Sequence, residues 1–112
     1  MTTKDKLQTN QTSELIVPIQ QGFLSTLLRD LSFTDLRVFL YLYSKFYSLG
    51  VSTKILPINE IVKDSGFKRD TVIRGLNSLD EQGYVHREKR QSKTEGYLPS
   101  RLTIPILRDS KL

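Results

Sequence analysis

A cluster of hydrogen-bond donors between positions 65 and 93 carries the clearest chemistry in this sequence. Arginine suits guanine O6 and N7, asparagine suits adenine N6 and N7, and isoleucine can meet the thymine methyl group. Lysine, serine and threonine suit phosphate oxygens, which position a protein without reading sequence. The candidate contacts are Ser65, Lys68, Arg69, Thr71, Ile73, Arg74, Asn77, Arg87, Lys89, Arg90 and Lys93. The alternative for each is an ordinary solvated side chain.

The sequence contains few of the residue patterns that catalysis or metal binding requires. The absence of cysteine excludes disulfides, thiolate nucleophiles and cysteine-based zinc sites. His86 is the single histidine of the sequence, and we expect it to be a polar or packed residue rather than a ligand. The sequence also lacks a glycine-rich phosphate loop and a Ser/His/Asp arrangement. We therefore expect that the protein is not an enzyme and that it binds no metal, cofactor or small-molecule ligand.

A helix from about Lys68 to Gln82 would position the central candidates. Val72, Leu76 and Leu79 recur at the spacing of one inner helical face, and Gly83 is a stop signal. At 100° per residue, the outward positions are Asp70, Arg74, Asn77 and Glu81, with Arg69 and Ile73 on the flank nearest the N-terminus. Because phosphate repels carboxylates, Glu81 is expected to lie away from a bound duplex.

A second, shorter helix precedes this one. Pro57 can open a helix at its first turn, and Ile58, Ile61 and Val62 give it an apolar stripe that ends at Ser65-Gly66. Two short helices joined by a tight glycine-containing turn form the unit that presents its second helix to a DNA groove. Ser65 and Thr71 would then be placed for phosphate, although Thr71 could equally pack against the turn.

Two further helices are predicted upstream. A short amphipathic helix spans about Gln20 to Asp30, and a long helix begins after Ser32 to Asp35 and runs to about Leu49. The long helix carries two apolar rows, which are Leu36, Phe39, Leu40, Tyr43, Phe46 and Tyr47, and Val38, Leu42 and Leu49. A helix that is apolar on two sides is buried on two sides, which favours a homodimer. The aromatic residues are expected to be core and interface rather than a base-stacking platform.

Short strands complete the predicted fold. Residues 84–88 and 101–106 form a hairpin, and residues 53–56 pair with a later segment. The polar loop of residues 89–99 has the length and chemistry of a wing. Four basic residues, Arg87, Lys89, Arg90 and Lys93, fall within seven positions, so a wing from 87 to 99 could contact phosphate or a narrow minor groove.

The segment from Ile58 to Val85 resembles the winged helix-turn-helix family. The matching positions are Ile58, Ile61, Gly66, Thr71, Val72, Leu76, Leu79, Gly83, Tyr84 and Val85. The segments Leu15–Ile19 and Leu31–Leu42 are similar to the lead-in of winged helices in plasmid and phage replication initiators and related mobile-element proteins. Those initiators usually carry a further domain. The resemblance spans roughly Leu15 to Ile106 and implies a mostly helical α+β winged helix with a β-hairpin wing.

Composition is compatible with this interpretation. A chain of 112 residues has room for one core, and 17 Lys and Arg against 12 Asp and Glu give a formal net charge of +5. No apolar run approaches the roughly 20 residues that cross a bilayer, and no signal segment is evident, so we expect a soluble cytoplasmic protein without membrane contact. We expect a disordered arm at 1–13, the DNA-binding domain at 14–107 and a frayed tail at 108–112.

These observations predict a sequence-specific protein that binds double-stranded DNA, with the helix at 68–82 in the major groove. It would be a transcriptional regulator or a replication or maintenance accessory protein of a plasmid, phage or other mobile element. The alternative is a winged-helix module for protein interaction in a replication or conjugation assembly, with weak affinity for DNA.

Overall fold

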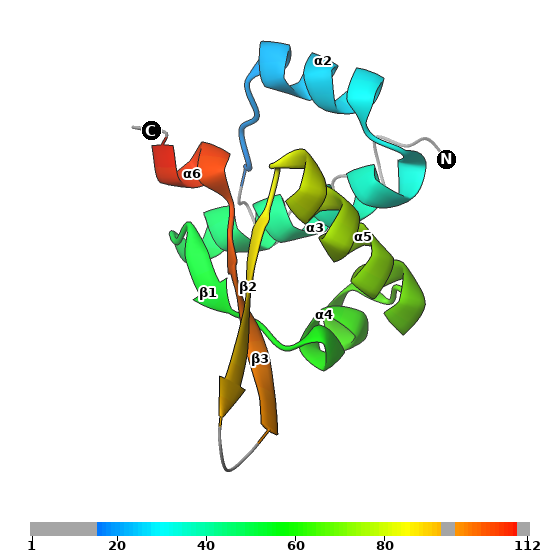
Figure 1. The fold of residues 1–112 in the computed structure, drawn as a ribbon. Coiled ribbons are helices and arrows are strands. Elements are labelled where there is room, and N and C mark those ends of the chain that lie inside the picture. Colours follow the sequence, from blue (N-terminus) through cyan, green and yellow to red (C-terminus); the bar gives the residue numbers. More distant parts are fainter. Residues whose placement is uncertain (1–15, 93–95, 110–112) are drawn as a thin grey trace, which may run out of the picture.

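The computed structural model describes residues 16–92 and 96–109, which form helices packed against one end of a long β-hairpin (Figure 1). The elements are α2 (Gln21–Asp30), α3 (Phe33–Leu49), β1 (Thr53–Ile55), α4 (Ile58–Ser65), α5 (Arg69–Gln82), β2 (His86–Ser92), β3 (Gly96–Thr103) and α6 (Pro105–Asp109). The predicted class, mostly helical α+β with a hairpin wing, is confirmed. The predicted arm at 1–13 and the candidate Lys93 lie outside the described residues.

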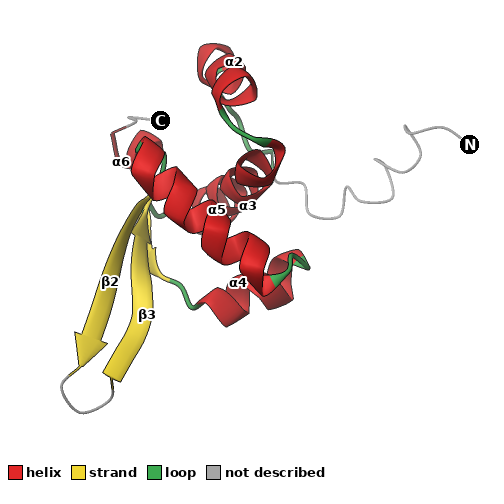
Figure 2. Cartoon of the chain, turned by 45° about the vertical axis from the view of Figure 1, so that its right-hand side comes forward, coloured by secondary structure: helices red, strands yellow, loops and turns green. Residues whose placement is uncertain are grey.

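The strands form one antiparallel sheet in the order β1-β3-β2. Thr53 pairs with Thr103, which confirms that the short strand after α3 joins a later one. Past the short strand β1, the paired strands β2 and β3 of this sheet continue away from the helices as the wing (Figure 2). The wing is more regular than predicted, because Arg90 pairs with Leu98 inside the segment expected to be a loop. Backbone hydrogen bonds hold such a pair even where its side chains are polar.

The C-terminal end of the sheet differs from the prediction. Alternating Leu102, Ile104 and Ile106 favoured a strand to residue 106, but β3 ends at Thr103 and α6 begins at Pro105. Proline has no N–H for a ladder and has a φ suited to the first turn of a helix. The tail expected to fray from residue 108 is therefore helical as far as Asp109.

Local signals set the helix boundaries. The Ser32 side chain accepts a hydrogen bond from the Asp35 N–H at 3.1 Å, which caps the start of α3. Gly66 and Gly83 follow α4 and α5 with φ of 78° and 85°, a left-handed conformation that costs glycine little. The ends predicted for the helix-turn-helix unit are thus confirmed to within one residue.

The core is built where α3 crosses α5. Its buried side chains include Leu27, Leu31, Val38, Phe39, Leu42, Tyr43, Phe46, Leu56, Ile61, Val72, Leu76, Leu79, Val85, Leu102 and Ile104. At the crossing Gly75 of α5 lies directly against Val38 of α3. Next to it the buried carboxylate of Asp35 accepts hydrogen bonds from Ser78 and Gln82 of α5. An apolar contact and a polar one therefore fix α5 on α3.

The two apolar rows of α3 are mostly buried within one copy of the chain. Phe39 and Phe46 of the first row and Val38 and Leu42 of the second are all fully buried. One compact chain therefore covers α3 from two sides, so the two rows do not by themselves require a second subunit, and the homodimer stays a prediction. Leu49 alone of the second row stays 52% exposed.

Candidate nucleic-acid interface

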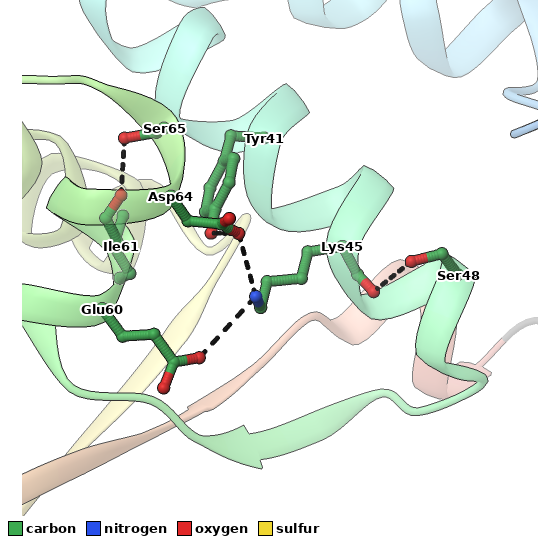
Figure 3. Close-up of polar contacts among 7 residues, drawn as sticks. All are labelled: Tyr41, Lys45, Ser48, Glu60, Ile61, Asp64 and Ser65. Carbon is green, nitrogen blue, oxygen red and sulfur yellow. Dashed lines mark hydrogen bonds and ion pairs between the residues drawn. The ribbon is translucent and has the colours of Figure 1, made fainter. Parts of the chain in front are cut away.

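A polar cluster fastens α4 to α3 and so sets the position of the helix-turn-helix unit (Figure 3). The Tyr41 hydroxyl donates to Asp64 Oδ2 at 2.7 Å, and Lys45 Nζ donates to the same oxygen at 3.0 Å. Lys45 also lies 3.6 Å from Glu60. The hydrogen bonds from Tyr41 and Lys45 lower the pKa of the Asp64 carboxyl, while burial and the Asp64 contact raise the pKa of Tyr41. Asp64 is therefore a charged anchor between the two helices at neutral pH.

The turn between α4 and α5 uses one of the predicted contact residues internally. The Ser65 hydroxyl donates to the Ile61 carbonyl at 2.6 Å and accepts from the Phe67 N–H at 3.1 Å. Its one donor hydrogen is thus engaged in ending α4 and starting the turn. Ser65 shapes the approach to α5, and a direct phosphate contact would require it to leave the Ile61 carbonyl.

The outward side of α5 is open to solvent. Arg74 and Asn77 are exposed, as are the acidic residues Asp70 and Glu81 at the two ends of the same face. The Arg74 side chain has one long hydrogen bond, at 3.5 Å to the Asp70 carbonyl. Ile73 is half-buried on the flank. The predicted recognition face is therefore not covered by the described part of the chain.

A groove of about 580 Å³ separates the start of α5 from the wing. It is lined by Pro57, Ile58, Asn59, Arg69, Arg87, Lys89, Arg90, Leu98, Pro99 and Ser100. Arg69 of α5 donates a hydrogen bond to Asn59 Oδ1 of α4, another residue of this lining. Four cations from α5 and β2 thus meet in one hollow, and among its described lining residues there is no carboxylate. This arrangement creates the positive field that attracts a phosphate backbone.

Arg87 braces the wing against α5. Its guanidinium donates to Asn77 Oδ1 at 2.9 Å and to the Ser100 hydroxyl at 3.2 Å, and its backbone N–H faces Asp80 Oδ1 at 3.4 Å. Two predicted contact residues, Arg87 and Asn77, are therefore bonded to each other. The bond aims the Asn77 amide, whose oxygen keeps a second lone pair and whose NH₂ can still donate.

The remaining wing cations are arranged differently. Lys89 is exposed, whereas Arg90 is half-buried and donates to the Pro99 carbonyl at 3.3 Å. Glu88, the one acidic residue described in β2, has its Oε1 3.3 Å from Nη1 of Arg101 in β3. This cross-strand ion pair offsets the charge of that carboxylate and leaves the wing predominantly basic.

Lys68 and Thr71 face a different hollow from Arg69. They line a space of about 320 Å³ together with Gly66, Phe67 and Arg37 of α3. The Arg37 guanidinium carbon lies 4.8 Å from the centre of the Phe67 ring and 5.4 Å from that of Phe33. No pattern in the sequence indicates this residue, because Arg37 belongs to another helix and only the crossing of α3 brings it beside the turn.

The described residues contain neither a candidate membrane span nor a candidate metal-binding group. No helix among residues 16–92 and 96–109 combines the length and apolarity needed to cross a bilayer. The same residues contain no group of three histidine, cysteine or acidic side chains arranged for a metal ion. Searches against protein-family models, curated proteins and solved structures found no match to this chain.

Proposed function

We propose that the protein binds double-stranded DNA at specific sequences, with α5 in the major groove and the wing beside the phosphate backbone or in the minor groove. The observation that carries the proposal is the groove between α5 and the wing, where Arg69 meets Arg87, Lys89 and Arg90. The open outer face of α5 supports it, because a reading helix must reach base edges.

The side chains divide into two roles under this proposal. Arg74 and Asn77 project from the middle of α5 and would read bases, with Ile73 available for a thymine methyl. Lys68, Thr71, Lys89 and Arg90 would contact phosphates and so position the helix. Asp70, on the same outer face, can accept a hydrogen bond only, which suits the cytosine N4 amino group rather than a phosphate.

Selection of bound sequences from a random duplex pool tests the proposal. We expect enrichment of a defined motif and a steep fall in affinity with salt, with a slope of log K against log salt of about −0.9 for each neutralised phosphate. A result that shows no enriched motif and no salt dependence would contradict the proposal. A flat salt response with retained binding to a protein partner would favour the interaction-module alternative.

The biological role follows as part of the same proposal. A protein with this geometry would serve as a transcriptional regulator or as a replication or maintenance accessory factor of a plasmid, phage or other mobile element. The alternative is a protein-interaction module in a replication or conjugation assembly. Such a module would bind its partner through exposed apolar side chains such as Leu28 and Phe33, which are 61% and 74% exposed.

We further propose that these apolar side chains join two copies into a homodimer that binds a two-part site. Replacing Leu28 by Asp should convert the dimer into a monomer, because a carboxylate in an apolar interface loses its hydration without gaining a partner. Sedimentation equilibrium at micromolar concentration measures the mass of each form. Arg29→Gln, one position along α2, is the matched control. A monomeric wild type would exclude the homodimer.

A further inference from the structure

We propose that Arg37, Lys68 and Thr71 form a second phosphate-binding site, on the flank of α5 opposite the wing. The inference rests on the proposed function and extends it. It assigns a DNA contact to α3, a helix outside the helix-turn-helix unit, and it predicts that α5 is held from both sides by the two backbone strands that border the major groove.

The flanks of α5 are distinguished by what packs on them. The wing side carries Asn77 and Asp80, which bond to Arg87. The α3 side carries Gly75 and Ser78, which lie against Val38 and Asp35. At 100° per residue, Arg69 and Thr71 point about 160° apart around the helix, so their hollows open on nearly opposite flanks.

The hollow on the α3 side has the chemistry of a phosphate contact. It combines the guanidinium of Arg37, the ammonium of Lys68 and the hydroxyl of Thr71, all of which donate to phosphate oxygens. Within the described residues, neither Arg37 nor Lys68 belongs to an ion pair, in contrast to Lys45 and Arg101. Both cations are therefore available to an outside anion.

Stacking holds Arg37 in place for this contact. Its guanidinium lies over the Phe67 ring, and Phe67 in turn meets Tyr41 edge-on with ring centres 6.3 Å apart. An arginine stacked on an aromatic ring keeps its N–H edges available for oxygen acceptors. Less side-chain freedom is then lost on binding than for an unsupported arginine.

The dimensions of DNA make a two-sided contact reasonable. A helix with its side chains is roughly 10–12 Å across, and the major groove is roughly 12 Å wide, so a helix in the groove has one phosphate strand on each flank. With Arg69, Lys89 and Arg90 toward one strand, Arg37 and Lys68 lie toward the other. A duplex is therefore the phosphate source to which we assign this site.

The test measures the salt dependence of binding to the selected duplex by fluorescence anisotropy. Arg37→Gln removes the charge, Arg37→Lys keeps it, and Arg29→Gln removes an equal charge from α2. We expect the slope of log K against log salt to become about 0.9 shallower in Arg37→Gln, with Arg37→Lys and Arg29→Gln close to wild type. The affinity loss should be equal for selected and random duplexes, because phosphate contacts do not read bases.

Several outcomes separate this inference from the proposed function. A wild-type slope in Arg37→Gln, alongside a weakened Arg69→Ala, overturns the phosphate site and leaves DNA binding intact. A flat salt response of the wild-type protein overturns both. If Arg37→Gln fails to fold, Lys68→Gln decides the question, because its exposed side chain serves the same site: a shallower slope supports the site and an unchanged slope overturns it.

Discussion

Replacing Arg69 and Arg74 together by alanine is expected to cause the largest loss of DNA binding in this protein. Each side chain contributes roughly 1 to 3 kcal/mol if it contacts a base or phosphate of the cognate site, which is about a fivefold to 150-fold change in Kd for each. Arg74 is exposed in the middle of α5, and Arg69 lies in the groove beside the wing. A mobility-shift titration with the selected duplex measures the effect.

The matched control for this double variant removes the same charge elsewhere. Arg29 and Arg108 are exposed and pair with the neighbouring Asp30 and Asp109, on helices α2 and α6. Arg29→Ala with Arg108→Ala should bind close to wild type, apart from a general effect of net charge. Equal affinities for the two double variants would contradict the assignment of α5 as the recognition helix.

Gly75→Val is expected to have the largest effect on stability. A Cβ at position 75 would lie 2.8 Å from Val38 Cγ2, which is closer than real Cβ atoms approach a neighbour, and 3.1 Å from Val38 Cβ, which is tighter than most such contacts. Val38 is fully buried and cannot turn away without disturbing its neighbours. Overpacking at such a contact costs about 3 kcal/mol, the upper part of the usual range. Urea denaturation followed by circular dichroism measures the loss.

Two companion variants make this prediction specific to the contact. Gly22→Val on α2 adds the same atoms where a Cβ would meet nothing within 4 Å, so stability should change little. Adding Val38→Ala to Gly75→Val removes the methyl groups that clash and should recover part of the lost stability. Strict additivity of the two changes would show that helix α5 does not press on α3 at this point.

The structure shows that some of the predicted contact residues are hydrogen-bonded within the protein, while others face the solvent. Arg87 and Asn77 were predicted as separate DNA contacts, but they form one bonded pair that joins the wing to α5. Ser65 is used to close the turn. Under the proposed function, Ser65 and Arg87 mainly hold the turn and the wing in position, and Arg87 orients Asn77 for its contact with a base. The outward-facing charge is then carried by Arg69, Arg74, Lys68 and Lys89.

The local sequence by itself determined the helices and the face that α5 presents. Ser32, Gly66 and Gly83 act on the backbone within one turn of their own positions, and the repeat of Val72 and Leu76 reports burial directly. These effects depend on neighbours in the chain, so they can be predicted without knowledge of the fold. The start of α6 at Pro105 is local too, but the alternating apolar pattern around it pointed to a strand.

Only the tertiary structure decided which side chains meet one another. The length of the wing strands, the burial of both rows of α3, the Arg87–Asn77 bond and the place of Arg37 beside Phe67 all depend on segments far apart in the sequence. A side chain's type gives the bonds it can make, but its partner is set by how helices cross and strands pair. Long-range packing therefore decides which cations face the solvent and which brace the fold.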